Sequence, residues 1–416
     1  MKHLWWFNPQ CEAENAARVA GYYTARDSTR ALAADLDVLP TFVAAGGDAV
    51  WVQSRPTTRY ADALSERGFA EPEFVERPLT HPDRRQWRAS PWGWSPDAAL
   101  LAAKLAAGEA DVHSVASWPD SRRACFAKTT WTGVLESLRH ELPADIAPPA
   151  VDVGVTCASA NDVTEAVAAL FAQDVAVAVV KAPFGTAGQG AKRVVKNQWG
   201  PGMLNWVQRI IDQQEEALVE PWRARLLDLS VLATVDTTGE TEVLGLTRFL
   251  TDRRGQYQGT WLHGPATAPL ERFRKPMEHT ARRVGAALAR RGHRGAFGVD
   301  AMVYAAPDAV GRPNTLTLKP LLEVNPRFTM GHIALSLAAR MPAVPAMWRL
   351  YGPKELKASG GPTALAGQLG SQNGWPTNDP TRVQRTLGMV VEDPVGRGLV
   401  EPVAGIDTNH LQGADD

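Results

Sequence analysis

The chain has 416 residues, of which 44% are hydrophobic and 21% charged, and its formal net charge is −1. Such a length predicts two or three globular domains with a buried core. The even balance of charge argues against general nucleic-acid binding, which usually requires a basic face.

The sequence carries no signal for secretion or for a membrane. The apolar run Leu4–Phe7 near the start is shorter than the roughly 7–15 residues of a secretory signal. No stretch of about 20 apolar residues predicts a membrane-spanning helix. The cysteines are odd in number and widely spaced, which is typical of reduced thiols (Cys11, Cys125 and Cys157). We therefore expect a cytoplasmic protein without a membrane partner.

The first part of the chain predicts a small α/β domain over residues 1–120. Leu4–Phe7 and Ala49–Gln53 are short apolar runs typical of strands, and Ala13–Ala25 between them favours a helix. This order predicts an open parallel sheet. Pro78–Pro96 has the composition of an aromatic loop, and Pro96–Ala107 that of a helix capped by Ser95 or Asp97.

Residues 121–215 predict a second unit with a glycine-rich hairpin. Cys125–His140 has an amphipathic helical pattern, and Ala160–Phe171 predicts another helix. The apolar strand Val175–Lys181 leads into a glycine-rich turn, and Ala191–Val195 continues as a strand. Two strands joined in this way predict a hairpin with a flexible lid, and the helix Met203–Gln214 follows it.

Residues 216–345 predict a third unit in which strands dominate, and residues 346–416 a C-terminal extension. Its expected strands are Ala217–Glu220, Asp228–Val235, Glu242–Phe249, Gly295–Tyr304 and Thr315–Glu323, of which the last two should pair in antiparallel fashion. Its expected helices are Arg274–Arg291 and Met330–Arg340. From about residue 350 the chain is rich in Gly, Pro and polar residues, which predicts a partly irregular segment.

The first motif with chemical meaning is Lys181 and the glycines after it. A lysine at the end of a buried strand is poorly solvated unless it meets an anion, and Gly185, Gly188 and Gly190 would let backbone N–H groups approach phosphate oxygens. The alternative is an ordinary hairpin turn. The loop departs from both familiar phosphate motifs, since Ala191 replaces the lysine of a P-loop and Arg193 the third glycine of a dinucleotide fingerprint.

The second motif combines three oxygen-bearing side chains. Glu323 and Asn325 are two residues apart, so on a strand they point to one face, and Asp300 lies on the strand expected to pair with theirs. Such ligands suit Mg²⁺, which also takes phosphate oxygens and water. The alternative is an aspartate in a turn and a strand end terminated by Pro326.

Two arginines and a short linker complete the candidates. Arg327 follows Pro326, and Arg248 ends a strand; guanidinium groups bind phosphate or carboxylate in bidentate fashion, although either could be an ordinary surface arginine. In the segment from Glu220 to Trp222 the backbone could meet an adenine edge. Asp228 could accept a hydrogen bond from ribose or steady Lys181.

Taken in this order, the motifs resemble the ATP-grasp superfamily over about residues 120–340. The resemblance implies an ATP-grasp fold of mixed α/β and α+β class, in which two α+β lobes enclose ATP behind a small parallel-sheet α/β domain. It implies that Lys128 and Lys181 contact the phosphates, that Gly185, Gly188 and Gly190 belong to the lid, and that Glu220, Trp222 and Asp228 meet the nucleoside. Asp300, Glu323 and Asn325 would hold magnesium, and Arg327 and Arg248 would steady the activated group.

Two N-terminal motifs carry a further, vaguer resemblance to uncharacterised bacterial ATP-grasp proteins. They are W-x-F-N-P, from Trp5 to Pro9, and P-W-G-W-S, from Pro91 to Ser95. Trp92 and Trp94 could line a substrate pocket or pack a loop onto the core, and packing is favoured because a buried indole contributes much apolar area. Pro221 stands where many relatives carry lysine, so the adenine contact should differ there.

The resemblance implies an ATP-dependent carboxylate–amine ligase, with ATP and Mg²⁺ (or Mn²⁺) as cofactors. A small-molecule carboxylate would become an acyl phosphate, and an amine substrate would then displace phosphate; the joining of amino acids or peptides is one reaction of this kind. The alternatives are a phosphotransferase on the same scaffold and a nucleotide-binding module without turnover. The sequence identifies neither the acid nor the amine, and it leaves a homodimer open.

Overall fold

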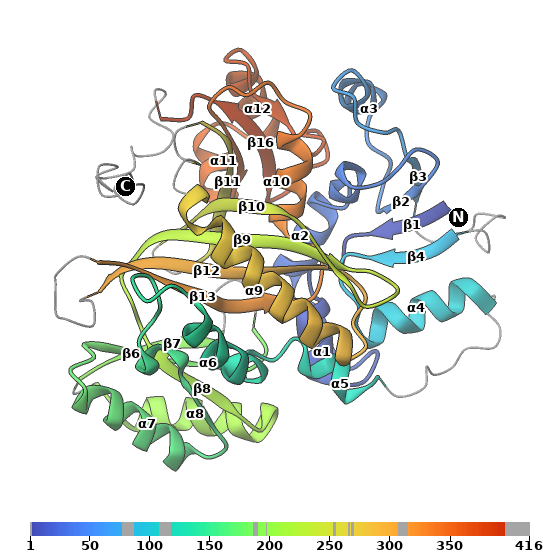
Figure 1. Ribbon diagram of the computed structural model, residues 1–416. Coiled ribbons are helices and arrows are strands. Elements are labelled where there is room, and N and C mark those ends of the chain that lie inside the picture. Colours follow the sequence, from blue (N-terminus) through green and yellow to red (C-terminus); the bar gives the residue numbers. More distant parts are fainter. Residues whose placement is uncertain are drawn as a thin grey trace.

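A computed structural model describes residues 2–76, 87–107, 118–185, 190–196, 198–252, 255–264, 267, 270–306 and 315–395. Three sheets organise these residues: a four-stranded sheet near the N-terminus, an eight-stranded sheet in the centre and a second four-stranded sheet (Figure 1). Among the described residues, no helix has both the length and the apolar composition to cross a membrane.

The N-terminal sheet is parallel, as predicted, with the strand order β3-β2-β1-β4. Its strands are β1 (Lys2–Trp6), β2 (Ala49–Val52), β3 (Glu73–Glu76) and β4 (Trp87–Pro91). The accompanying helices are α1 (Cys11–Ala17), α2 (Asp27–Asp35), the 3₁₀ turn Leu39–Phe42, α3 (Thr58–Ser65) and α4 (Pro96–Ala107).

Two predictions for the N-terminal part are corrected. Trp87–Pro91 is a strand rather than a loop, because it pairs with β1 along its whole length. The first helix ends at Ala17, where Arg18 adopts a left-handed conformation with φ 67°.

The second four-stranded sheet has the order β5-β8-β6-β7. Its strands are β5 (Val155–Cys157), β6 (Val177–Lys181), β7 (Ala191–Val195) and β8 (Ala217–Pro221). The predicted hairpin is present, since Lys181 pairs with Ala191 in antiparallel register. The helices α7 (Ala160–Ala172) and α8 (Pro201–Gln214) lie along this lobe (Figure 1), and Ser159 caps the start of α7 with a capping box.

The segment between these two sheets contains α5 (Asp120–Ala124), a 3₁₀ turn over Lys128–Trp131, α6 (Thr132–Glu141) and a second 3₁₀ turn over Ala150–Val153. The sequence predicted one continuous helix over Cys125–His140. The helix is instead interrupted at Lys128, whose backbone N–H bonds to the carbonyl of Pro183, outside this segment. This interruption brings Lys128 next to the glycine-rich turn.

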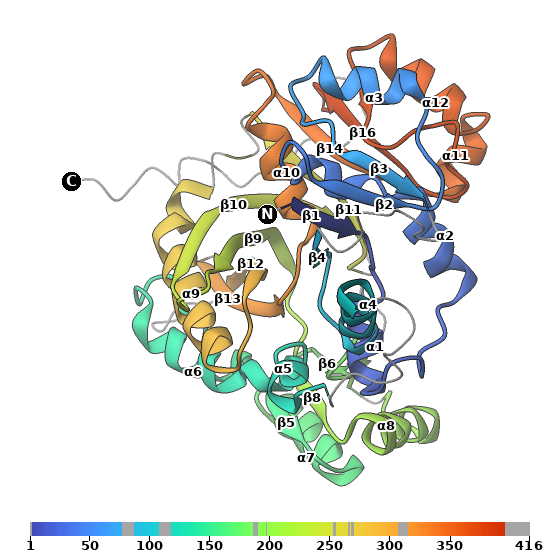
Figure 2. The same cartoon turned by 90° about the vertical axis from the view of Figure 1, so that its right-hand side faces the viewer.

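The central sheet has the order β13-β12-β9-β10-β11-β14-β16-β15. Its first five strands are β9 (Arg225–Val235), β10 (Thr241–Thr251), β11 (Tyr257–His263), β12 (Gly295–Ala306) and β13 (Thr315–Asn325). The long helix α9 (Leu270–Arg290) covers one face, where Phe273, Met277 and Val284 join the buried core (Figures 1 and 2). The helix α10 (Met330–Ala338) follows β13 and packs against β11 and β10.

The predicted pairing of β12 with β13 is confirmed, and it places Asp300 directly opposite Glu323. The register shifts between Asp300 and Met302, so that the three residues of β12 from Asp300 to Met302 face the longer run from Lys319 to Glu323. Pro320 lies within that run and has no N–H to offer the ladder, which favours such a bulge.

The C-terminal segment is more regular than its composition predicted. It forms β14 (Ala346–Tyr351), α11 (Pro353–Ala358), α12 (Pro362–Gly370), β15 (Trp375–Pro376) and β16 (Leu387–Glu392). The three strands extend the central sheet beyond β11. The expectation of an irregular segment is therefore wrong for residues 346–392, because the buried apolar runs of β14 and β16 outweigh the surrounding Gly and Pro residues.

Candidate active site

A cavity of about 340 Å³ lies between the β6–β7 hairpin with β8 on one side and the central sheet on the other. We call it the nucleotide cavity, after the ligand that the sequence resemblance predicts for it. Nine residues singled out from the sequence line it: Lys128, Lys181, Gly185, Gly190, Glu220, Trp222, Asp228, Asp300 and Glu323. Gly188 lies outside the described residues. Side chains up to 195 positions apart in the chain are thus brought to one cleft.

A buried triad of charges forms one wall of the nucleotide cavity. The Lys181 ammonium and the Lys319 ammonium contact the two carboxylate oxygens of Glu220, the second at 2.8 Å. Burial would raise the pKa of Glu220, but the two lysines outweigh it and lower that pKa to about 2. Burial, together with the charge of Lys319, lowers the pKa of Lys181. With all three groups ionised the triad carries one net positive charge, which favours an anion nearby.

Lys128 approaches the same cavity from the other side. Its ammonium lies 2.7 Å from a carboxylate oxygen of Glu323 and donates a 2.6 Å hydrogen bond to the carbonyl of Gly185. Burial lowers the pKa of Lys128, but the charges of Glu323 and Glu12 outweigh burial and raise it overall. Lys128 therefore joins the start of the glycine-rich turn to the carboxylates of the central sheet.

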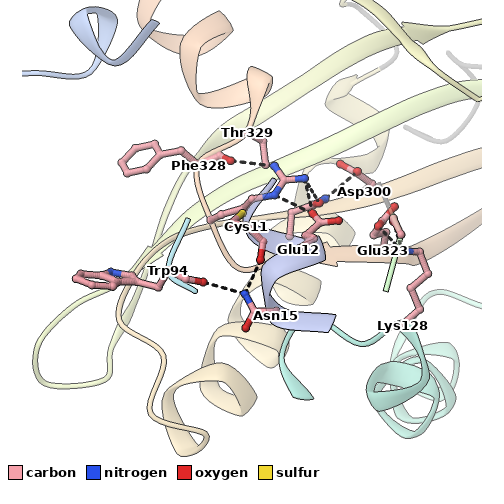
Figure 3. Close-up of polar contacts among 12 residues, drawn as sticks. Cys11, Glu12, Asn15, Trp94, Lys128, Asp300, Glu323, Phe328 and Thr329 are labelled. Carbon is pink, nitrogen blue, oxygen red and sulfur yellow. Dashed lines mark hydrogen bonds and ion pairs between the residues drawn. The ribbon is translucent and has the colours of Figure 1, made fainter. Parts of the chain in front are cut away.

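The three metal-ligand candidates lie together at the floor of the cleft (Figure 3). The Asn325 amide donates to Asp300 at 3.0 Å, and Asp300 faces Glu323 across the β12–β13 ladder. Burial and the nearby charge of Glu323 raise the pKa of Asp300 to about 7. Two carboxylates in this position repel each other unless a cation or a proton intervenes. The donor set of two carboxylates and one amide suits Mg²⁺.

A cluster of three or more acidic, histidine or cysteine side chains able to hold a metal by itself is not found in the part of the chain that the structure describes. An ion at Asp300 and Glu323 would therefore need further oxygen ligands, such as phosphate and water. Mg²⁺ is commonly bound in this way, by one or two carboxylates together with substrate phosphates.

Apolar and aromatic side chains also line the nucleotide cavity. Val179 from one lobe and Met302 and Leu322 from the central sheet are among them, together with Phe249. Trp222 lines the cavity as well, with the guanidinium of Arg193 4.9 Å and that of Arg225 5.3 Å from its ring. Apolar side chains contributed by both sides of the cavity suit a flat heterocycle.

Asp228 also lines the nucleotide cavity and is already engaged. Thr251 donates a 2.7 Å hydrogen bond to one carboxylate oxygen, and Arg225 lies 3.2 Å from the other. Burial raises the pKa of Asp228 despite these partners. Any contact of Asp228 with a ribose would therefore share oxygens that Thr251 and Arg225 already use.

Arg327 contacts Asn325, one of the metal-ligand candidates, and an acidic residue from the N-terminal part holds its guanidinium. Its guanidinium donates to one oxygen of Glu12 at 2.8 and 2.6 Å, to Asn325 Oδ1 at 3.0 Å and to the carbonyl of Phe328 at 3.0 Å. Burial lowers the pKa of Arg327, but Glu12 outweighs burial and raises it. Sequence reasoning missed Glu12, which lies 315 positions from its partner.

Arg248 does not line the cleft that contains the carboxylates of Asp300 and Glu323. It lies on β10 opposite Leu229, whose side chain belongs to the core under α9, whereas the neighbouring pair Phe249 and Asp228 faces the cleft. Arg248 lines an adjoining cavity of about 530 Å³, and burial lowers its pKa. The geometry thus separates the two arginines that the sequence presented as similar candidates.

The two tryptophan-containing motifs of the N-terminal part bind each other. The Asn8 side chain donates a 2.8 Å hydrogen bond to the carbonyl of Gly93 and accepts one of 3.2 Å from its N–H. A Cβ at Gly93 would lie 2.4 Å from Cys11 Sγ and 3.1 Å from Arg327 Cβ. Glycine is therefore required where the P-W-G-W-S segment passes between α1 and Arg327.

The predicted packing role of Trp92 is confirmed, because this residue is only 4% exposed and belongs to a core cluster. Trp92 and Trp94 also border a second cavity, of about 780 Å³, between the N-terminal sheet and the central sheet. We call it the aromatic cavity. Arg327 also lines the aromatic cavity, and its contact Asn325 bonds to Asp300, which lines the nucleotide cavity.

Comparison with known proteins gives similarities of two kinds. No family model matches the chain. A segment of 179 residues is 26% identical to the [butirosin acyl-carrier protein]–L-glutamate ligase of Niallia circulans, which covers 43% of the chain and 39% of that relative. The match thus spans well under half of the relative's length.

The similarity to solved structures extends over nearly the whole chain. The N5-carboxyaminoimidazole synthetase of Staphylococcus aureus, solved with ADP, matches with a TM-score of 0.51 and 13% identity, covering 96% of both chains. The N5-carboxyaminoimidazole ribonucleotide synthetase of Thermus thermophilus matches with a TM-score of 0.47 and 12% identity, covering 96% of the chain and 95% of that structure. The arrangement of sheets and the first of these likenesses lead to one conclusion: the chain has the ATP-grasp fold, with a small parallel-sheet domain ahead of its two lobes.

Proposed function

We propose that the chain binds ATP in the nucleotide cavity and uses it to activate a carboxylate, which is then joined to an amine. The observation that carries this proposal is the convergence of Lys128, Lys181, Asp300 and Glu323 on one cleft. The cleft is lined by lysines, by carboxylates and by apolar side chains. A nucleoside triphosphate with a divalent ion has the complementary pattern of charge and apolar surface.

Each group of residues in the nucleotide cavity would contact a different part of Mg-ATP. Val179, Met302 and Leu322 would enclose the adenine, and the Lys181 triad and Lys128 would offset the charge of the phosphates. Asp300, Glu323 and Asn325 would hold Mg²⁺, which supplies further charge neutralisation when bound. Catalysis of this kind depends on positioning and charge stabilisation rather than on a protein nucleophile.

The proposed reaction has two steps. A carboxylate oxygen of the acid attacks the γ-phosphorus, the bond to the β–γ bridging oxygen breaks, and ADP leaves. The amine then attacks the carbonyl carbon of the acyl phosphate, an amide forms, and inorganic phosphate leaves with release of a proton. Arg327 lies where it would orient the carboxylate, beside Asn325 and close to the ion site. The name of the Niallia circulans relative, a ligase, supports joining over phosphate transfer alone.

The test is ADP release by the full chain with Mg-ATP and a panel of carboxylic acids, each with and without a panel of amines. The proposal predicts release that requires both an acid and an amine, together with formation of the amide. Phosphate transfer to a hydroxyl acceptor, with no amide formed, would identify a phosphotransferase instead. Binding of Mg-ATP without any release would indicate a nucleotide-binding module.

A further inference from the structure

The aromatic cavity has the size and position of a second substrate site. Its volume of about 780 Å³ falls in the range of roughly 300–1,000 Å³ that is typical of small-molecule pockets. Its walls come from β1, the segment after β4, the start of α5 and the segment after β13. It therefore lies where the N-terminal sheet meets the central sheet.

Partly exposed aromatic rings line this cavity in fixed orientations. The Trp5 indole N–H donates to Asp48 at 2.9 Å, and that of Trp118 donates to Asn15 Oδ1 at 2.8 Å. The Asn15 amide also donates to the carbonyl of Trp94 at 3.0 Å (Figure 3), so one buried asparagine holds two tryptophan segments. Phe328 packs edge-on against Trp5 at 5.4 Å. Rings that are already ordered lose little conformational entropy when they contact a ligand.

The charged residues at the cavity wall are almost all cationic. Arg88, Arg122, Arg294 and Arg327 line it, and the acidic residue among the lining side chains is Asp236. One oxygen of Asp236 accepts hydrogen bonds from the backbone N–H groups of Thr238, Gly239 and Glu240 in its own turn. Within the described residues, Arg88 and Arg122 have no acidic partner at ion-pair distance. The cavity thus favours an anionic ligand.

Arg327 connects this cavity to the proposed chemistry. It lines the aromatic cavity, while its guanidinium contacts Asn325 on the strand that carries Glu323. An acid bound with its body among the tryptophans and its carboxylate toward Arg327 would present that carboxylate to the nucleotide cavity. Aromatic rings with cations at the edge fit a flat, aromatic body that carries the negative charge.

We propose that the aromatic cavity binds the acid substrate and that this acid is an aromatic carboxylate. The proposal rests on the ligase function above, since it names the class of acid that would be activated. It makes Trp94 a specificity-determining residue.

Three probes distinguish the contribution of the ligand's aromatic ring to binding from that of its negative charge. They are indole-3-acetate, its neutral analogue indole-3-ethanol, and the aliphatic anion hexanoate. Isothermal titration of the full chain should give binding of indole-3-acetate at least 10-fold tighter than that of either other probe. Trp94→Ala should weaken indole-3-acetate binding about 10-fold, and Arg88→Ala should weaken it several-fold. Trp206→Ala, on α8 in the other lobe, and Arg59→Ala, exposed on α3, are the matched controls and should leave it unchanged.

Equal affinity for hexanoate and indole-3-acetate would overturn the proposal, as would wild-type affinity of Trp94→Ala or failure of all three probes to bind at millimolar concentration. These titrations need no turnover, so they are independent of the ligase test. Indole-3-acetate binding without ADP release in any acid–amine mixture would reject the ligase and keep the site. ADP release with aliphatic acids only would reject the site and keep the ligase.

Discussion

The nucleotide cavity and the aromatic cavity are built in opposite ways. The first is lined by ionised side chains that neutralise one another in pairs, such as Lys128 with Glu323. The second is lined by aromatic rings whose polar atoms are directed away into hydrogen bonds, with arginines at its edge. A site for a highly charged nucleotide and a site for the organic part of an acid substrate thus require different side chains.

The largest expected effect comes from breaking the nucleotide cavity alone. Lys181→Ala and Glu323→Ala should each reduce ADP release by ~10³-fold or more, because charge stabilisation of the transferred phosphate carries most of the catalysis. Lys181→Ala leaves Glu220 paired with Lys319, so the fold should persist. Steady-state ADP release and circular dichroism check both statements.

Lys357→Ala changes an exposed lysine of α11, and Glu66→Gln changes the exposed glutamate that directly follows α3; both variants should keep normal turnover. Wild-type ADP release by both Lys181→Ala and Glu323→Ala would show that the site is assigned incorrectly.

The next largest effect should come from the boundary between the cavities. Arg327→Lys should lower kcat/KM for the acid by about 10²-fold, since a lysine cannot reproduce the bonds that the planar guanidinium makes to Glu12, Asn325 and Phe328. The affinity for ATP, measured by titration without acid, should change by less than threefold. An equal loss of ATP affinity would mean that Arg327 serves the nucleotide rather than the acid.

A smaller effect should follow from loosening the aromatic cavity. Asn15→Leu removes the hydrogen bonds that hold Trp94 and Trp118, so indole-3-acetate should bind roughly 10-fold more weakly and the free energy of unfolding should fall by about 1–3 kcal/mol. Binding of Mg-ATP should remain normal. Asn161→Ala, at an exposed position of α7, is the control. Unchanged acid binding in Asn15→Leu would show that ring orientation does not limit affinity.

The two cavities should also differ in the pH dependence of stability, which is the smallest expected effect. In the nucleotide cavity Asp300 keeps its proton up to about pH 7, whereas the unfolded chain loses it near 3.8. In the aromatic cavity burial lowers the pKa of His293 from 6.5 to about 4. Without ligands, Asp300 therefore reduces the free energy of unfolding as pH rises from 3.8 to 7, while His293 increases it as pH rises from 4 to 6.5.

Replacing Asp300 and replacing His293 should change the pH dependence of the free energy of unfolding in opposite directions. Asp300→Asn should be relatively more stable than the wild type at pH 8, by on the order of 1–4 kcal/mol, and His293→Gln should be less sensitive to acid between pH 6.5 and 4. Urea unfolding at several pH values measures both. Asp62→Asn, exposed on α3, should follow the wild type. Parallel profiles for all four proteins would contradict the assigned shifts.

The residues that line the nucleotide cavity could be singled out from the sequence because their signals are local. The spacing of two between Glu323 and Asn325, and the lysine directly before a glycine-rich turn, follow from the geometry of single strands. Lys319 was missed although it carried a signal, since a charged residue inside an apolar strand needs a buried partner.

The aromatic cavity and its boundary were beyond such reasoning. Glu12 and Arg327 lie far apart in the chain, and nothing in either segment encodes their meeting. The strand β4 and the strands after residue 346 were missed for a related reason: their pairing partners decide their conformation more than their own composition does.

Helix α1 gives the two cavities a common support. It has only seven residues, and on it Glu12 holds Arg327 while Asn15 holds the tryptophans. Cys11 of this helix packs closely against Gly93, which also lies next to Arg327. Occupancy of one cavity should therefore alter affinity in the other, and by thermodynamic linkage the factor is the same in both directions. Cooperativity between the acid and the nucleotide would then originate in a helix that belongs to neither lobe.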